Sequence, residues 1–293
     1  MPILATYPIT EIARAKVNLT LEVLGKRPDG YHELCSLVAF ADFGDTLTLQ
    51  PAERWSLATA GPTSSAIAGG NIVDRAAVAV AAAWPNAKTG AALLEKILPV
   101  FAGVGGGSAD AAACLRALKR LNADTLGAAE IDWRALARSL GADVPVCLGS
   151  GLSLMQGTGE RVQMLRQRHA LCAVLINPRA AVSTASVFAD LAAPPLQQDA
   201  ATIQFQEPAT LADLLCLIQV GRNDLEAPAM RVAPVIGDVL KILAATPGCQ
   251  LARMSGSGST CFGLYETATA AEAAASEIAA NRPEWWVRGT ILS

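Results

Sequence analysis

The sequence has little charge, and almost no excess of one sign over the other. Charged residues make up 17% of the 293, the formal net charge is −3, and the sequence pI is about 5.5. This balance leaves no basic field of the kind that holds nucleic acid or an anionic membrane surface. We therefore expect neither a nucleic-acid partner nor a membrane partner.

Long apolar runs and paired cysteines are also missing. The longest apolar runs, such as residues 76–84 and 170–176, are too short to cross roughly 30 Å of hydrocarbon. The N-terminus lacks the charged-then-apolar layout of a secretion signal, so we expect a cytoplasmic protein. The seven cysteines are scattered and never form a Cys-x-x-Cys pair, which argues against a disulfide framework and structural zinc.

The first fifty residues predict a β-meander. From Ala15 to Val23, apolar side chains at positions 17, 19, 21 and 23 alternate with polar ones at 16, 18, 20 and 22, which is typical of a strand with one face in water. The turn signature Pro28-Asp29-Gly30 predicts a chain reversal into a second strand near residues 34–40. Alternation at residues 46–50 predicts a third strand.

Helical and extended patterns mix along the rest of the chain. Periodicity and capping signals predict helices over residues 74–84, 110–121, 133–140, 210–220, 235–245 and 268–280. Strands, or short extended elements, are expected over residues 91–98, 171–176, 250–254, 260–265 and 286–292. The layout is α+β, and its length suits two domains. Glycine, serine and threonine accumulate near residues 149–159, and we place the boundary there, between 1–155 and 156–293.

The strongest local signal is the run from Pro99 to Asp110, in which glycines lead directly into a helix. We call its residues 103–107 the glycine loop. Glycines let successive backbone N–H groups point at one anion, and the helix N-terminus adds partial positive charge, so a polyphosphate is a natural ligand. The loop matches neither a Walker A motif nor the dinucleotide fingerprint, because no Gly-Lys-Ser/Thr follows and Ser108 stands at the third glycine position. A plain glycine-rich turn is the alternative.

Three further features are ambiguous by themselves, and we interpret them together with the glycine loop. Lys16 and Asn18 project to one face of the first strand, although such a pair is more often a solvated surface. Residues 255–259, Ser-Gly-Ser-Gly-Ser, form a second small-residue segment, the serine loop, which either wraps a ligand or turns the chain. Asp143 follows a helix end and is either a functional carboxylate or a turn-stabilising one.

In this order the motifs resemble those of the GHMP kinases. The resemblance runs from about residue 11 to near the C-terminus and rests on these segments: Ala15-Lys16-Val17-Asn18-Leu19, Asp29-Gly30-Tyr31-His32, the run from Pro99 to Asp110, Gly141-Ala142-Asp143-Val144-Pro145, Asn223-Asp224-Leu225-Glu226 and Ser255-Gly256-Ser257-Gly258. The Asp-Gly-Tyr-His and Gly-Ala-Asp-Val-Pro pieces resemble, more narrowly, the branch that acts on cytidine diphosphate-linked methylerythritol in the non-mevalonate isoprenoid pathway.

The resemblance implies a fold and a reaction. The implied fold has an N-terminal domain like the second domain of ribosomal protein S5 and a C-terminal α/β-plait, with the site in the cleft between them. The implied reaction moves the terminal phosphoryl group of ATP to the 2-hydroxyl of the acceptor. Asp143 would accept the hydroxyl proton as general base, and Lys16 would favour ionised Asp143 and offset charge on the phosphoryl oxygens. Mg2+ bridging the phosphates is expected, with protein ligands that the sequence does not identify.

The resemblance also implies binding residues. The nucleotide side comprises Asn71, Lys96, Pro99, Ala102, Gly103, Val104, Gly105, Gly106, Gly107, Ser108 and Ala109. The acceptor side comprises Asn18, Tyr31, His32, Phe188, Gly256 and Ser257, with aromatic rings around the cytosine. Without the resemblance, Tyr31 and Phe188 would be ordinary core residues and His32 a structural histidine. Val104 and Ala109 depart from the family's usual leucine and second serine, and Phe101 stands where a small residue is usual.

Other functions stay open at this point. A mevalonate, homoserine or sugar kinase of the same superfamily keeps the fold and changes the acceptor. A nucleotide-binding regulator without catalysis is disfavoured by the presence of Lys16 and Asp143. A serine hydrolase is disfavoured because no Gly-x-Ser-x-Gly occurs and only His32 and His169 are available as base.

Overall fold

The computed structural model describes residues 7–64, 70–99, 103–123, 131–166, 169–197 and 205–293. The chain groups into two compact units that interleave in sequence. Unit 1 takes Met1–Ala15, Phe43–Val100 and Gly105–Gly149, and unit 2 takes Lys16–Asp42, Phe101–Val104 and Ser150–Ser293. The division at residue 155 stays a prediction about family domains, whereas the compact units place residues 16–42 with the C-terminal part of the chain.

Unit 1 contains a small sheet of strands in the order β4-β5-β3. These strands are β3 (His32–Ala52), of which unit 1 holds the second half, β4 (Ser56–Ala60) and β5 (Thr89–Glu95). β5 runs antiparallel to β3 and parallel to β4. β1 (Ile9–Asn18) also pairs with β3, and like β3 it contributes residues to both units.

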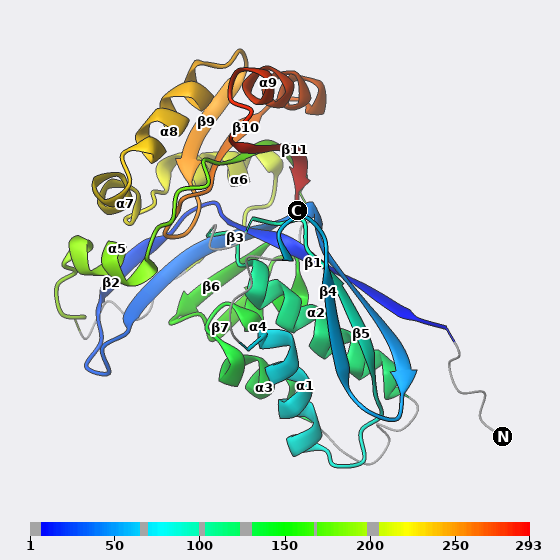
Figure 1. Ribbon diagram of the computed structural model, residues 1–293. Helices are drawn as coiled ribbons and strands as arrows, with labels where there is room; N and C mark the ends of the chain where they lie inside the picture. The colour runs from blue at the N-terminus through cyan, green and yellow to red at the C-terminus, as the bar shows by residue number, and fades with distance from the viewer. Residues whose placement is uncertain (1–6, 65–69, 100–102, 124–130, 167–168, 198–204) are drawn as a thin grey trace. The chain divides into compact units, whose positions relative to one another are not determined.

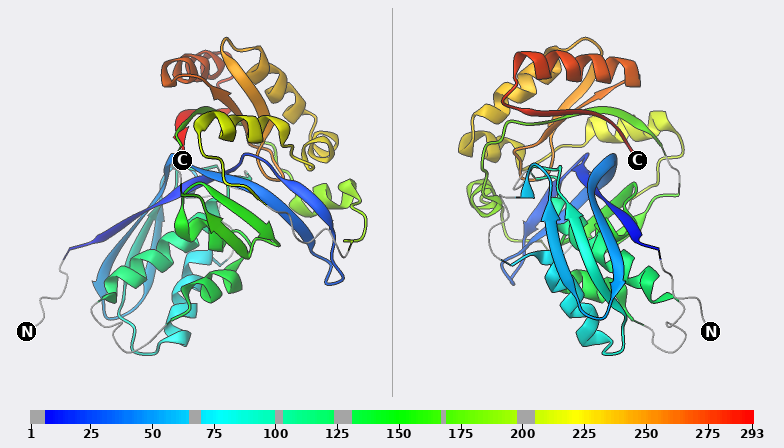
Figure 2. Two further views of the ribbon diagram at one scale, coloured as in Figure 1. Left: turned by 180° about the vertical axis from the view of Figure 1, so that it is seen from behind. Right: turned by 45° about the vertical axis from the view of Figure 1, so that its right-hand side comes forward.

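The helices of unit 1 are α1 (Ile72–Ala83), α2 (Gly106–Leu121), α3 (Trp133–Leu140) and α4 (Val144–Gly149). α1 and α2 are alanine-rich, which lets their backbones approach closely. α1 lies beside α2, and α2 also packs on α4 (Figure 2). The face of α2 that carries Ala111, Ala112, Leu115 and Leu118 is fully buried, so this helix and the glycine loop at its start rest on the unit's core.

Unit 2 contains a second group of strands around the first half of β3. β2 (Glu22–Lys26) and β6 (Ser153–Gly157) both run antiparallel to β3, on its opposite sides, and β7 (Arg161–Met164) pairs with β6. The β2–β3 turn contains the predicted Pro28-Asp29-Gly30, with Gly30 at a φ of 90°. Tyr31 and His32 follow this turn directly.

The rest of unit 2 is an antiparallel sheet covered by helices. Its strands, in the order β11-β8-β10-β9, are β8 (Leu171–Asn177), β9 (Cys249–Met254), β10 (Cys261–Tyr265) and β11 (Trp286–Leu292). α8 (Val235–Ala245) and α9 (Ala268–Asn281) cover one face of this sheet (Figure 1). Between them they bury side chains such as Ile236, Leu243 and Ile278 against Val174 and Ile176. α5 (Thr184–Leu191), α6 (Leu211–Val220) and α7 (Glu226–Val232) complete the unit.

Most sequence-based elements are confirmed within a few residues. The separate second and third strands predicted near residues 34–40 and 46–50 are wrong, because β3 runs without a break from His32 to Ala52. The helix at 235–245 and the strand at 286–292 have the predicted bounds, and Asp132 and Gly141 cap α3 as expected. α2 begins at Gly106, four positions before the predicted start at 110, because Gly105 in the left-handed region already caps it. In the described residues no helix is both long and apolar enough to cross a bilayer.

The prediction of a water-facing strand at residues 15–23 is wrong in two respects. The strand β1 ends at Asn18, and β2 begins only at Glu22. The polar face is also buried, with Lys16 3%, Asn18 0% and Thr20 8% exposed. Hydrogen bonds to neighbouring segments satisfy these polar groups, so alternation alone did not distinguish a wet face from a buried polar one.

Candidate active site

The glycine loop has the geometry of an anion-binding helix start. Gly105 adopts a φ of 65° and caps α2, and the amide of Ala109 donates to the Gly105 carbonyl over 2.8 Å. The N–H groups of the residues between them therefore begin the helix without intrahelical acceptors. Such amides, together with the positive end of the helix dipole, favour phosphate oxygens.

Within unit 2, the start of the glycine loop contacts the serine loop. Gly103 has a φ of 72°, and a Cβ added there would lie 2.4 Å from the carbonyl oxygen of Gly258. A Cβ on Gly256 would in turn lie 3.2 Å from the carbonyl oxygen of Gly103. Only glycine permits this approach of two backbones, which explains the residue type at both places.

Lys16 and Asn18 join the same two loops. The Lys16 amide donates to the Val104 carbonyl over 2.9 Å, and its ammonium donates to Asn18 Oδ1 over 2.8 Å. The Asn18 amide donates to Ser255 Oγ over 3.0 Å. Three of the predicted segments of the site, distant in sequence, thus meet inside unit 2.

Hydrogen bonds from the Asn223-Asp224-Leu225-Glu226 motif, to which the sequence alone gave no role, stabilise the serine loop. Asn223 Nδ2 donates to the carbonyls of Met254 and Gly256, each over 2.8 Å. Glu226 Oε2 accepts from the Met254 amide over 2.8 Å. The Asn223-Asp224-Leu225-Glu226 motif therefore fixes the strand end from which the serine loop starts.

Arg253 is a contributor that sequence analysis missed. It is 8% exposed, and its guanidinium donates to the carbonyls of Leu19, Ile218 and Gly221 over 2.7 to 2.8 Å. Burial lowers the pKa of this guanidinium, against the opposing charge of Glu226. Because Leu19 directly follows Asn18, Arg253 holds the end of β1 in place. An arginine within an apolar strand is the only sequence signal for this role.

Asp143 lies in unit 1, at the junction between two helices. Gly141 ends α3, and the Asp143 carbonyl accepts from the Cys147 amide over 3.3 Å in the first turn of α4. The side chain is half-buried. The sequence predicted a turn in this segment, and in the structure the short helix α4 also begins directly after the aspartate. Its pairing with Lys16 of unit 2 stays a prediction.

Several predicted nucleotide-side residues also belong to unit 1. Asn71 caps α1, with its Oδ1 accepting from the Val73 amide over 3.0 Å. Pro99 is half-buried, and Ala102 and Phe101 lie outside the described residues. Lys96 is 4% exposed, and its ammonium contacts the carboxylates of Asp45 and Asp110. The ammonium of Lys96 is thus already paired with two carboxyl groups.

Two of the predicted acceptor-side aromatic residues, His32 and Phe188, are in contact in unit 2. The rings of His32 and Phe188 stack with centroids 4.6 Å apart and an interplanar angle of 25°. Tyr31, next to His32, is 64% exposed. Burial, assisted by the charge of Lys26, lowers the pKa of His32, so the imidazole is neutral at pH 7. A neutral imidazole can both donate and accept a hydrogen bond, as the edge of a nucleobase requires.

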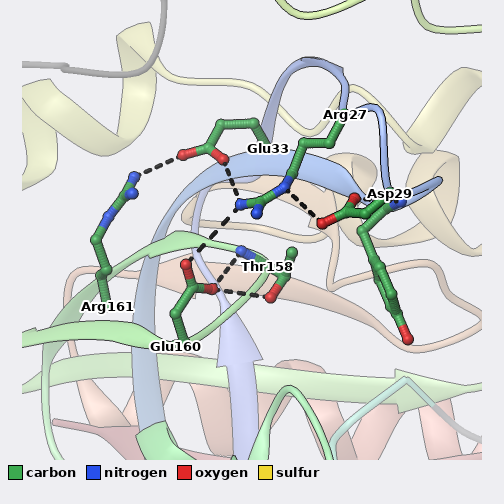
Figure 3. A network of polar contacts seen from close by, with 7 residues as sticks. Arg27, Asp29, Glu33, Thr158, Glu160 and Arg161 are labelled. Atoms are coloured by element: carbon green, nitrogen blue, oxygen red, sulfur yellow. Dashed lines mark hydrogen bonds and ion pairs between the residues drawn. The ribbon is translucent and has the colours of Figure 1, made fainter.

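A network of ion pairs holds the turn that carries Tyr31 and His32 (Figure 3). Glu33, 2% exposed, accepts from Arg27 over 3.1 Å and from Arg161 of β7 over 2.6 Å. Arg27 also contacts Asp29 over 3.2 Å, and Asp29 accepts from the Tyr31 amide over 3.1 Å. The network was not predicted, because Glu160 and Arg161 are distant in sequence from the turn, and the motif that contains Asp29 does not indicate the pairing.

A backbone contact brings α5 to the same turn. Lys26 of β2 exchanges hydrogen bonds of 2.8 Å with Pro194 and Leu196, just beyond the C-terminal end of α5. The segment after α5 is thus an additional strand-like neighbour of β2. This pairing explains how Phe188 of α5 reaches His32.

Comparisons with known proteins agree with this geometry. The family model described as GHMP kinases N terminal domain matches residues 71–151, and the one described as GHMP kinases C terminal matches residues 200–284. The chain is 47% identical over 294 residues to the 4-diphosphocytidyl-2-C-methyl-D-erythritol kinase of Bradyrhizobium diazoefficiens, covering 97% of this chain and 98% of the relative. It is 49% identical over 290 residues to the enzyme of the same name from Rhodopseudomonas palustris, covering 96% of each.

Solved structures give the same result. A crystal structure of 4-(cytidine 5'-diphospho)-2C-methyl-D-erythritol kinase superposes with a TM-score of 0.76 at 35% identity, covering 97% of this chain and 100% of that one. A homoserine kinase from Cytophaga hutchinsonii shares the fold at 17% identity, with a TM-score of 0.69 over 98% of this chain and 94% of that one. The expected two-domain fold is confirmed, and the chain belongs to the GHMP kinase family.

Proposed function

We propose that this kinase transfers the γ-phosphoryl group of ATP to the 2-hydroxyl of 4-diphosphocytidyl-2-C-methyl-D-erythritol, a step in the non-mevalonate synthesis of isoprenoid precursors. One observation within the chain carries the choice of acceptor. The stacked His32 and Phe188 offer aromatic faces and a neutral imidazole to a base, and the preceding residue, Tyr31, is exposed. An acceptor without a nucleobase would have no use for such a group.

In this proposal Asp143 and Lys16 carry out the chemistry. The Asp143 carboxylate takes the proton of the 2-hydroxyl while the hydroxyl oxygen forms a bond to the γ-phosphorus. The bond from that phosphorus to the β,γ-bridging oxygen breaks, and ADP leaves with the electron pair. The Lys16 ammonium, oriented by Asn18, offsets charge on the transferring group.

The amides of Gly106, Gly107 and Ser108 at the start of α2 hold the nucleotide phosphates. The described residues contain no group of three or more His, Cys, Asp or Glu side chains that could hold a metal ion. In this proposal Mg2+ would enter with the nucleotide as part of the substrate, where it would neutralise phosphate charge. Asn71, Lys96 and Pro99 lie on the adenosine side, and Gly256 and Ser257 lie toward the acceptor. We place the reaction in the cytoplasm.

An acceptor panel tests the proposal. ADP release is measured with ATP and the cytidine diphosphate acceptor, with mevalonate, homoserine and galactose in parallel reactions. We expect turnover with the cytidine compound alone. Turnover with one of the other compounds would support the kinase activity but contradict the proposed acceptor. ATP binding without turnover of any acceptor would support the regulator instead.

A further inference from the structure

A buried cluster of three charged side chains lies near Gly106 of the glycine loop, in unit 1. Asp45 of β3 is 0% exposed, Lys96 after β5 is 4% exposed, and Asp110 of α2 is 3% exposed. We call these three residues the ion-pair cluster. They come from three separate segments, and burying them is costly unless each charge has a partner.

Asp45 holds the segment that leads to the glycine loop. Its Oδ1 accepts from the amides of Ile97 and Leu98, over 2.6 Å and 2.8 Å. Its Oδ2 accepts from the Lys96 ammonium. One carboxylate thus fixes three successive residues where the chain leaves β5.

Lys96 connects that segment to the helix on the other side of the loop. Its ammonium donates to Asp110 Oδ2 over 2.6 Å, and Asp110 lies one turn into α2. A Cβ added to Gly106 would have the Lys96 ammonium as its nearest neighbour, at 3.8 Å. The ammonium therefore lies close to Gly106, the first residue of α2 and one of those whose amides we assign to phosphate binding.

The cluster contains two carboxyl groups and one ammonium, so the single cation can balance only one ionised carboxylate. Among the described residues, Asp110 Oδ1 is buried without a hydrogen-bond partner. Burial, against the opposing charge of Lys96, raises the pKa of Asp110 to about 7. Removing the ammonium would leave two buried carboxylates with no cation between them.

We propose that Asp45, Lys96 and Asp110 are positioning residues that fix the glycine loop for the nucleotide phosphates, with the Lys96 ammonium acting through Asp110 and not on the nucleotide itself. The inference rests on the proposed role of the glycine loop. It differs from a direct contact between Lys96 and ATP in one measurable respect. If Lys96 acts by balancing Asp110, then neutralising Asp110 compensates for its loss.

The test compares Lys96→Met with the double variant Lys96→Met/Asp110→Asn. Methionine keeps much of the lysine volume without the charge. We expect Lys96→Met to raise the KM for ATP on the order of tenfold to a hundredfold, with the KM for the acceptor within about twofold of wild type. The double variant should recover most of this loss. No recovery, or further loss, would overturn the proposal and favour a direct contact with ATP.

A second pair of variants, at Asp45, tests the proposal independently in case Lys96→Met does not fold. Asp45→Asn keeps an oxygen acceptor for the two backbone amides, whereas Asp45→Ala removes it. We expect Asp45→Ala to raise the KM for ATP and Asp45→Asn to restore it to within a few-fold of wild type. If both variants raise the KM values for ATP and acceptor together, in step with a fall in the urea midpoint, the role is structural only and the proposal is wrong.

Glu11→Gln is the matched control, because it removes ion pairs that α2 makes further along, through Arg116 and Arg120. We expect it to leave both KM values unchanged. Titration of wild type with a non-hydrolysable ATP analogue distinguishes a failure of the proposed kinase function from a failure of the positioning role alone. If wild type does not bind the analogue, the kinase function fails and the positioning role with it. If it binds and the rescue is absent, only the positioning role fails.

Discussion

The imidazole of His32 stacks on the phenyl ring of Phe188 at a centroid distance of 4.6 Å, although one residue begins β3 and the other lies on α5. The pair is held from both sides. The ion-pair network of Glu33 fixes the turn next to His32, and the backbone pairing of Lys26 fixes the segment after α5. Such a preorganised aromatic surface is suited to a nucleobase, since little freedom remains to be lost on binding.

Tyr31→Ala tests this surface without disturbing the core, because Tyr31 is 64% exposed. Loss of one stacking ring should raise the KM for the cytidine acceptor by about tenfold. The KM for ATP and the urea midpoint should stay at wild-type values. Tyr31→Phe keeps the ring and is the control. An unchanged acceptor KM in Tyr31→Ala would remove Tyr31 from the acceptor site.

Asp143→Asn should abolish most turnover while both substrates still bind. Removal of a general base typically lowers kcat by about 10² to 10⁴-fold, and an amide of the same shape preserves the start of α4. Steady-state kinetics and titration with the ATP analogue measure the two effects. Asp132→Asn is the control, since asparagine caps α3 as well as aspartate does. A kcat near that of wild type would exclude Asp143 as the base.

Gly107→Ala separates phosphate binding from folding. Gly107 lies in the first turn of α2, and a Cβ there would meet only Ile72 Cγ2, at 3.8 Å. We expect the variant to be more stable by about 0.5–1 kcal/mol, because alanine favours the helix. We also expect its KM for ATP to rise, because the methyl group crowds the amides that hold phosphate.

Gly237→Ala in α8 is the control for that stabilisation. Its Cβ would lie 3.4 Å from the flexible Met230 side chain, so it should gain stability with an unchanged KM for ATP. Chemical denaturation and ATP titration of the kinetics give both numbers. An unchanged KM for ATP in Gly107→Ala would argue against the proposed position of the phosphates.

Asp110→Asn should change how stability depends on pH. In the folded protein burial raises the pKa of Asp110 to about 7, from an ordinary value of 3.8 that the unfolded chain retains. Between these values the folded state holds a proton that the unfolded state has lost. The contribution of Asp110 to stability is therefore full below pH 4 and falls as pH rises to 7.

Urea denaturation of wild type and Asp110→Asn at pH 5, 6, 7 and 8 measures this dependence. The free energy of unfolding of wild type, relative to the variant, should decrease from pH 5 to pH 7 and then level off. The exposed carboxylate of Asp238 supplies a control variant, Asp238→Asn, for the general effect of losing an acid. A difference that stays constant across the series would contradict the buried titration.

Local signals were enough to predict most of the elements and the glycine loop. Asp132 and Gly141 define α3 because capping is a property of a few neighbouring residues. The resemblance in motif order then supplied the family. The Gly103–Gly258 contact was not predicted, because neither glycine segment carries information about its distance from the other.

Burial of the polar side chains could not be predicted from the sequence for a related reason. Alternation at residues 15–23 indicates a polar face. That this face is buried follows from hydrogen bonds of Asn18 with Ser255 and Ser36, which are distant in sequence. In the ion-pair cluster, Lys96 and Asp110 belong to segments that the sequence singled out, but nothing in those segments or around Asp45 indicates that the three side chains pair. Only the assembled sheet and helix bring their charges together.

The interleaving of the two units bears on how this enzyme can be dissected. A recombinant fragment that starts at Ser150 would lack β2 and all of β3, so β6 would lose its hydrogen-bonding neighbour from Leu34 to Val38. An unpaired edge of that kind promotes aggregation. Split-protein designs would therefore need to supply residues 16–42 in trans, because the C-terminal half of the gene product is not a self-sufficient folding module.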